Sequence, residues 1–155
     1  MGDSKLQLAH PPIVEAVVDI DCDLSATQDL SALEAPALAR FKDSYPKVTR
    51  QWLQEYRIEP APYGAPAPHE GRHAVQALRF HQEGDRQLVQ VRAQGYSFNR
   101  LSPYTALDEY LPEIERTWLS YLEIAAPIQV RQIRLRYINR ILIPIPLGQV
   151  SWMTT

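Results

Sequence analysis

Two segments of the chain alternate between apolar and polar residues with the period of two that is typical of a half-buried β-strand. From Ile13 to Leu24 the apolar face carries Val14, Ala16, Val18, Ile20, Cys22 and Leu24, and the polar face carries Glu15, Asp19, Asp21 and Asp23. From Val130 to Ile143 one face carries Gln132, Arg134, Arg136 and Arg140, and the other carries Ile133, Leu135, Tyr137, Ile141 and Ile143. The pattern predicts an acidic first strand and a basic last strand.

Apolar residues at helical spacing predict two helices between these strands. The first is indicated by Leu30, Leu33, Leu38 and Phe41, and Pro36 inside it predicts a kink or a late start. The second follows Ser102-Pro103, an N-cap before a proline, and continues to Glu123. Pro112 is expected to kink or restart it.

The segment 47–58 fits two patterns. Val48, Trp52, Leu53 and Tyr56 fall on one helical stripe, whereas Val48-Thr49 and the flanking prolines suit an extended arm. We take it as a helix. The stretch 59–71, with four prolines and two glycines, predicts a surface loop.

Two further strands, 73–82 and 86–97, are joined by the turn Glu83-Gly84-Asp85 and predict a hairpin. The resulting order β-α-β-β-α-β is the split βαβ pattern of ferredoxin-like folds. We therefore expect one α+β domain over residues 1–155, with an antiparallel-rich sheet in the order 4-1-3-2 and helices on one face. Residues 145–155 have no clear period and are expected to form a flexible or exchanged tail.

Composition narrows the class of protein. The 155 residues are 45% hydrophobic and 22% charged, which is typical of a globular domain, and the net charge of −2 argues against a strongly electrostatic nucleic-acid binder. A single cysteine allows no internal disulfide, and no apolar run approaches a membrane span, so a cytoplasmic location without membrane contact is expected.

The predicted topology places the acidic strand beside the basic one, so cross-strand ion pairs on the uncovered face are the simplest reading of both rows. If this face binds a partner, the candidate binding residues are Glu15, Arg92, Arg134, Arg136, Tyr137, Asn139 and Arg140.

Two other chemistries remain open on the same face. Asp19, Asp21 and Asp23 are spaced so that they could hold Mg²⁺ or Mn²⁺ for a phosphoesterase or nuclease reaction. The arginines could instead bind nucleic acid. No catalytic residue is assigned: Cys22 lies on the apolar side of its strand, and the pair His69 and His73 surrounds Gly71 at the end of the predicted loop rather than lying on a helix face.

Two motifs resemble those of a known family. His10-Pro-Pro-Ile-Val-Glu-Ala16 and Leu135-Arg-Tyr-Ile-Asn-Arg-Ile141 are similar to the N-P-P-I-x-E-A opening and the L-R-Y-I-N-R-I strand of a sporadically distributed family of uncharacterised bacterial proteins. His10 stands where the family usually has Asn. The resemblance is to the N-terminal half of longer members, and it implies no established activity.

The function expected from the sequence is that of a non-enzymatic interaction or assembly domain without a cofactor. Its expected partner is a second copy of the chain or another protein, with the metal-dependent enzyme and the nucleic-acid binder as alternatives.

Overall fold

Six antiparallel strands and two helices form the protein in a computed structural model that describes residues 9–58 and 69–143. The α+β class predicted from the sequence is confirmed. The elements, in chain order, are β1 (Ile13–Asp23), α1 (Leu30–Phe41), β2 (Lys47–Ile58), β3 (His69–His81), β4 (Gln87–Arg92), β5 (Gly95–Leu101), α2 (Leu107–Ala125) and β6 (Gln129–Asn139).

The strands lie in the order β2-β3-β4-β5-β1-β6. Four strands that follow one another in the sequence form an antiparallel meander, and β1 then pairs with both β5 and β6. The acidic and basic strands are therefore neighbours, as predicted. The ferredoxin-like order is wrong, because the sheet has two more strands than that fold and the chain runs β-α-β-β-β-β-α-β.

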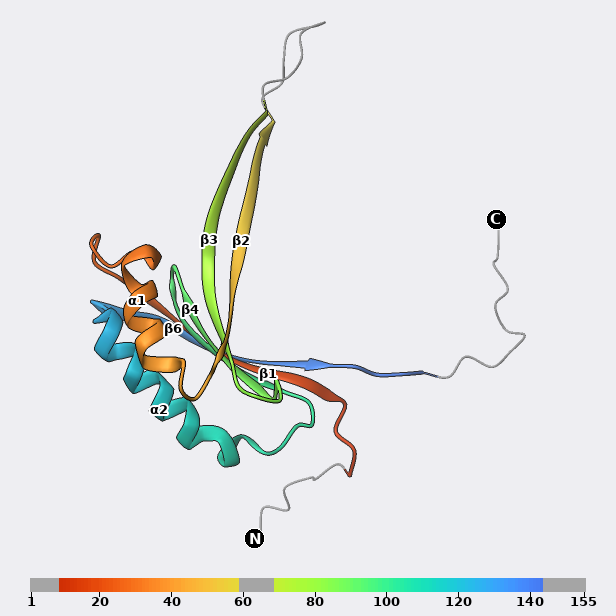
Figure 1. Ribbon diagram of the computed structural model, residues 1–155. Helices are drawn as coiled ribbons and strands as arrows, with labels where there is room; N and C mark the ends of the chain where they lie inside the picture. The colour runs from red at the N-terminus through yellow and green to blue at the C-terminus, as the bar shows by residue number, and fades with distance from the viewer. Residues whose placement is uncertain (1–8, 59–68, 144–155) are drawn as a thin grey trace, which may run out of the picture.

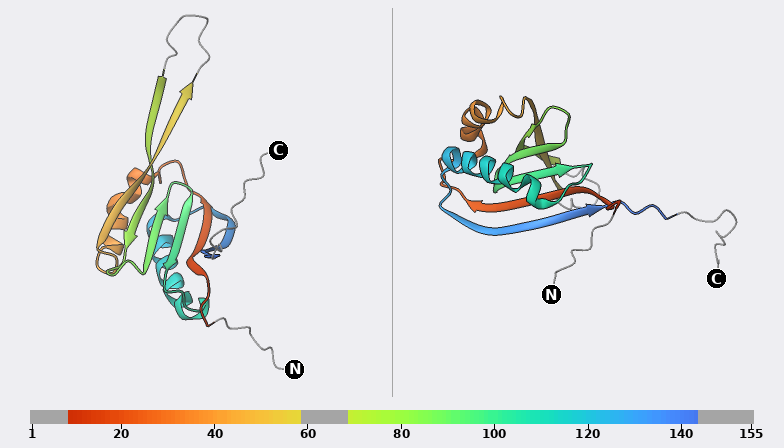
Figure 2. Two further views of the ribbon diagram at one scale, coloured as in Figure 1. Left: turned by 90° about the vertical axis from the view of Figure 1, so that its right-hand side faces the viewer. Right: turned by 90° about the horizontal axis from the view of Figure 1, so that it is seen from below.

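Both helices cover the same face of the sheet, as predicted, and the core lies between the two layers (Figure 2). Tyr96 and Phe98 of β5 are fully buried there, and Tyr96 packs against Trp118 and Tyr121 of α2 at centroid distances of 5.5 and 5.7 Å. In the described ranges, no helix lies on the other face. Cys22 is buried in the core, as its place in the alternation predicts.

The prolines interrupt neither helix. α1 starts at Leu30, where Asp29 caps it by accepting a hydrogen bond from the backbone N–H of Ala32, so the late start at Pro36 is wrong. α2 runs through Pro112 from Leu107 to Ala125, and the predicted start after Ser102 is several residues too early.

Residues 47–58 form strand β2, so the helix predicted there is wrong. β2 pairs along its whole length with β3. It is an edge strand with polar residues on both faces, and so it lacks the clean alternation that identifies a half-buried strand. Its partner β3 begins at His69, so the end of the loop predicted over 59–71 belongs to a strand.

The predicted strand 86–97 is in fact a second hairpin. β4 and β5 are joined by Ala93 and Gln94, and Gly95 opens β5 with φ +141°. The β3–β4 hairpin is confirmed: Gly84 and Asp85 adopt the positive φ angles of +85° and +50° in its turn.

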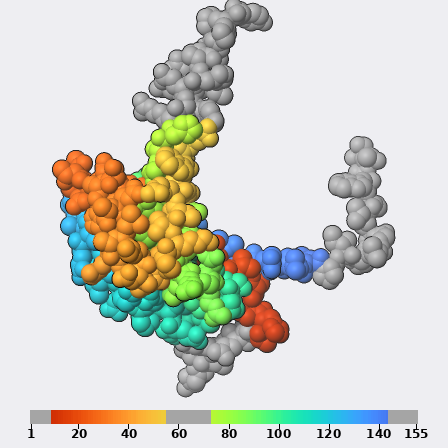
Figure 3. Space-filling model, viewed as in Figure 1, coloured from red at the N-terminus to blue at the C-terminus, as the bar shows by residue number. Residues whose placement is uncertain are grey.

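Two parts of the sheet extend beyond the compact body (Figures 1 and 3). The far ends of β2 and β3 project together as a ribbon, and the end of β6 projects in a different direction next to the start of β1. The predicted tail 145–155 lies outside the described residues. No helix in the described ranges combines the length and the apolar character that a membrane crossing requires.

Candidate functional site

The face of the sheet without helices carries a hydrogen-bonded polar layer, which we call the polar face. It is built from alternate residues of β1, β4, β5 and β6, whose other neighbours point into the core. Although no helix covers this face, four of its polar side chains are buried beneath longer neighbours: Asp19, Gln90, Ser97 and Asn99.

Asp19 is the most enclosed carboxylate of the polar face, at 5% exposure. Its Oδ1 accepts a hydrogen bond of 2.6 Å from the Ser97 hydroxyl, and its Oδ2 accepts one of 2.9 Å from Arg136 Nε. Burial disfavours the ionised carboxylate, but these hydrogen bonds and the positive charges of Arg136 and Arg92 outweigh it, so the pKa of Asp19 is lowered.

Asp21 lies between two guanidinium groups. Arg92 donates to its Oδ1 at 2.7 Å from β4, and Arg134 donates to its Oδ2 at 2.9 Å from β6. At the next position, Asp23 pairs with Arg131 at 2.9 Å. The row of aspartates thus faces a row of arginines, and each carboxylate already has a cation.

The remaining candidates of the polar face differ from the sequence expectation. Glu15 accepts a hydrogen bond from Asn99 rather than from an arginine. Arg140 and Asn139 are exposed, and among the described residues Arg140 forms no side-chain ion pair. Their roles in binding stay predictions.

This geometry bears on the two other chemistries considered for this face. Within residues 9–58 and 69–143 no group of three or more acidic, histidine or cysteine side chains is placed to hold a metal ion. Asp19, Asp21 and Asp23 point at guanidinium groups, which compete with a cation for the same oxygens. Three of the arginines that would bind phosphates, Arg92, Arg134 and Arg136, are in turn paired with these aspartates.

The Asp19 cluster predicts a stability that depends on pH. Because the pKa of Asp19 is lower in the folded chain, its stabilisation is fully present above the unfolded pKa of about 3.9 and is lost as the pH falls through the folded pKa. We expect Asp19→Asn to lower the free energy of unfolding by about 1–2 kcal/mol at pH 7 and by much less at pH 2.5. Urea denaturation at both pH values measures this difference.

Asp43→Asn is the control for that measurement, since Asp43 is exposed and forms no side-chain hydrogen bond among the described residues. An equal loss for Asp19→Asn at pH 7 and pH 2.5 would contradict the assignment, because it would show that the substitution acts through packing rather than charge.

A second surface lies on the opposite side of β6. Its apolar residues pair with β1 residues of the core layer, so they point to the same side as the helices: Val130, Ile133, Leu135 and Tyr137. We call these four residues the edge surface. Ile133 is 67% exposed and Leu135 45% exposed, although both occupy the phase of a core residue.

The edge surface is exposed because the helical layer is narrower than the sheet. α2 packs on β5, and β6 lies two strands further out. The flank of α2 that carries Glu113 faces α1 and Tyr45, which leaves Leu111 on the other flank, 48% exposed. Tyr137 contacts the connection between β5 and α2, where its ring lies 5.9 Å from the Tyr104 ring in an edge-to-face arrangement.

The two faces of β6 differ in how far the fold engages them, and a binding role for its arginines stays a prediction. The arginines, which were the candidates for binding, are largely engaged inside the fold, whereas the apolar residues expected in the core are in contact with solvent. The exposure of these apolar residues follows from the ratio of helices to strands, since two helices on one face cannot cover all six strands.

Comparison of the chain with protein-family models, with curated proteins and with solved structures found no match. The resemblance of the two sequence motifs to a bacterial family therefore stays a prediction.

Proposed function

We propose that the protein is an assembly domain that associates with a second copy of itself through β6. The observation that carries this proposal is the edge surface: among the described residues β6 is paired only with β1, so its other edge lacks a neighbouring strand, and its row on the helical side is apolar and exposed. A soluble monomer usually protects an edge strand with charged side chains, bulges or a covering segment. The arginines of β6 do not serve this purpose, because they fold back on the aspartates of β1.

The other edge of the sheet provides a contrast within the same molecule. The described part of β2 carries mostly polar side chains, among them Lys47, Thr49, Arg50 and Gln51. Two large apolar residues, Trp52 and Leu53, are exposed on it. β2 is therefore the better protected edge, and β6 is the edge open to a partner.

A second copy of the chain can pair with the free edge of β6 and cover its apolar row at the same time. When a strand pairs antiparallel with its own copy about a two-fold axis, each face of the strand meets the same face of its partner. The edge surfaces of the two copies then form one apolar layer on the helical side of a continuous twelve-stranded sheet, since each copy contributes six strands. Leu111 of each α2 lies at the border of this layer.

The charges on the other face of β6 select a register. Pairing Arg134 with Arg136 of a second copy would place two guanidinium groups opposite each other, which is unfavourable. A register centred on Ile133 instead places Arg134 opposite Gln132, the neutral residue of the row, although it also places Leu135 opposite Arg131 rather than opposite another residue of the edge surface. It also leaves Arg134 and Arg136 free to keep their bonds to Asp21 and Asp19.

Three apolar residues follow β6, beyond the last contact of this segment with the start of β1. The last backbone contact joins the N–H of Arg140 to the carbonyl of Pro12, and the next three residues are each at least 70% exposed: Ile141, Leu142 and Ile143. They lengthen the apolar area that a second copy covers and bring the contact nearer to the roughly 800 Å² per partner of a stable complex.

Hydrogen exchange tests the mode of association directly. In the dimer, the outward backbone N–H groups of residues 129–139 are hydrogen-bonded, so we expect their exchange to slow at least about tenfold between a dilute and a concentrated sample. The outward N–H groups of β2 form the internal control and should not change. Equal rates in β6 at both concentrations, in a sample shown to be dimeric by sedimentation, would place the interface elsewhere.

A further inference from the structure

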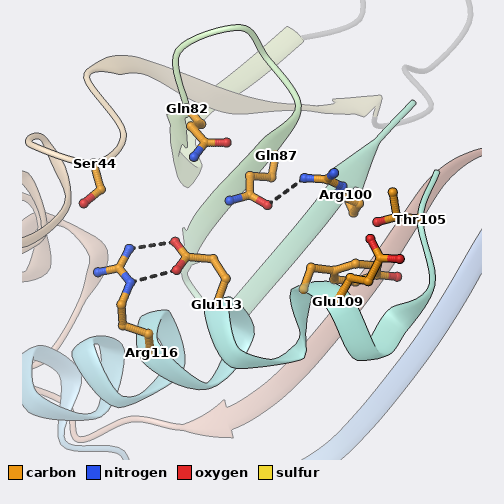
Figure 4. A pocket seen from close by; sticks show the side chains of 9 residues that line it. Ser44, Gln82, Gln87, Arg100, Thr105, Glu109, Glu113 and Arg116 are labelled. Atoms are coloured by element: carbon orange, nitrogen blue, oxygen red, sulfur yellow. Dashed lines mark hydrogen bonds and ion pairs between the residues drawn. The ribbon is translucent and has the colours of Figure 1, made fainter. Parts of the chain in front are cut away.

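A polar pocket of about 510 Å³ lies on the other flank of α2, away from the edge surface (Figure 4). It is a surface pocket open to solvent, lined by the first half of α2, the ends of β4 and β5, and the residues that flank β2 and β3. Its lining residues are Ser44, Gln82, Gln87, Arg100, Thr105, Glu109, Tyr110, Glu113 and Arg116. A volume of this size suits a small molecule.

The floor of the pocket is a fixed chain of hydrogen bonds. Arg116 donates two bonds to Glu113, of 2.7 and 2.8 Å, and Glu113 accepts a third, of 2.7 Å, from the Tyr45 hydroxyl. Gln87 donates to the Tyr45 oxygen at 3.4 Å and accepts from Arg100 at 3.1 Å. These bonds, led by those from Arg116, lower the pKa of Glu113, so this carboxylate is ionised and already neutralised by Arg116.

Two charged groups of the pocket lack a counter-charge among the described residues. Arg100 has no carboxylate partner: its guanidinium carbon lies 5.9 Å from the centre of the Tyr110 ring, and its Nε is buried without a hydrogen bond. Its Nη1 bonds Gln87, which leaves Nη2 free to donate. Glu109 is exposed at the rim and forms no side-chain hydrogen bond or ion pair with a described residue.

The sequence places Arg100 in an unusual position for a charge. It shares the phase of β5 with the core residues Tyr96 and Phe98, so it points to the helical side. A partly buried cation without a counter-charge is unfavourable, and a bound anion removes this cost. Figure 4 shows Arg100, Thr105 and Glu109 together at one end of the pocket, so a cation and an anion both face the same space.

We propose that this pocket binds a small zwitterion of the α-amino-acid class. Its carboxylate accepts hydrogen bonds from Arg100 Nη2 and the Thr105 hydroxyl, and its ammonium group pairs with Glu109. The neutral amides of Gln82 and Gln87 and the Ser44 hydroxyl then face its side chain. The pocket and the edge surface lie on opposite flanks of α2, so this proposal is independent of self-association.

Calorimetric titration with the L-amino acids, and with derivatives that lack one charge, tests the proposal on the intact protein. We expect at least one amino acid to bind with a dissociation constant below about 10 mM. Its N-acetyl derivative and its amide should each bind at least about tenfold more weakly, because each has lost one of the two ion pairs. If no amino acid binds at this concentration, or if acetate binds as tightly as the best amino acid, the proposal is overturned.

Glu109→Gln links the ligand's ammonium group to one residue. In this variant the amino acid and its N-acetyl derivative should bind with equal affinity, because the partner of the ammonium group is gone. Glu109 is exposed, so the substitution leaves the fold intact, and Glu115→Gln, outside the pocket on the same helix, is the control that keeps wild-type binding. Retention of the wild-type preference for the free amino group in Glu109→Gln would overturn the assignment.

Discussion

Leu135→Asp is expected to abolish self-association while the monomer stays folded. Leu135 is 45% exposed at the centre of the edge surface, so the monomer loses little packing. In the dimer the substitution removes a buried leucine, worth about 1.5–3 kcal/mol, from each copy and places a carboxylate in an apolar layer. We expect the dissociation constant to rise at least about 100-fold, which corresponds to roughly 2.7 kcal/mol. Sedimentation equilibrium over a range of protein concentrations measures it.

Leu53→Asp is the matched control, because it makes the same substitution at a similarly exposed position on the other edge strand. It should leave the dissociation constant unchanged. The proposal fails if the wild-type chain is a monomer at high micromolar concentration. It fails as well if both variants weaken association equally, since that outcome would indicate non-specific hydrophobic contact. A monomer that instead retains a different protein through Leu135 would identify β6 as an interface for another partner.

Gly95→Ala is expected to have the largest effect on stability. A Cβ at Gly95 would lie 2.1 Å from the backbone carbonyl oxygen of Ile20, and φ is +141°, which L side chains rarely adopt. Neither strand can withdraw easily, because Gly95 is paired with Asp21 of β1 and with Arg92 of β4, and the N–H of Cys22 donates to the carbonyl of the preceding residue, Gln94. We expect the free energy of unfolding to fall by about 3–5 kcal/mol, a large part of the stability of an ordinary domain.

Gly84→Ala separates the steric effect from the effect of backbone angle. Gly84 also has a positive φ, of +85°, but no atom lies within 4 Å of the position a Cβ would take. Its substitution should cost only about 1 kcal/mol. Denaturant unfolding of both variants tests the distinction, and similar losses at the two positions would contradict the close approach of β5 to β1.

The parts of the fold that could be predicted are those with one strong local pattern. β1 and β6 alternate over many residues, and Asp29 and the apolar stripe define α1. β2 could not be predicted, because an edge strand that projects from the body has no buried face to impose alternation. The β4–β5 turn was missed because Ala93-Gln94 lacks the Asn-Gly signal of tight hairpins.

For the candidate sites as well, some features follow from a local sequence pattern and others depend on how the whole chain packs. The alternation of β1 and β6 was enough to predict which residues share a face. The pairing of the acidic and basic strands was predicted correctly, although the ferredoxin-like order from which it was inferred is wrong. Which face of β6 is exposed depends on how far the helical layer extends, and this is not encoded in β6 itself. Arg100 did carry a local signal, because its charge occupies a position of β5 that points to the same side as the core residues Tyr96 and Phe98.

The place of β1 between β5 and β6 also sets the order of events during synthesis. The two strands that pair with β1 begin only at Gly95 and at Gln129. Both pairings therefore close very long loops of chain. At the usual speed of translation, the stretch from β1 to the start of β5 takes roughly 4–14 s to emerge. The apolar row of β1 has neither of these strands to pair with during that time, and because pairing between strands far apart in the sequence forms slowly, we expect this sheet to close late in folding.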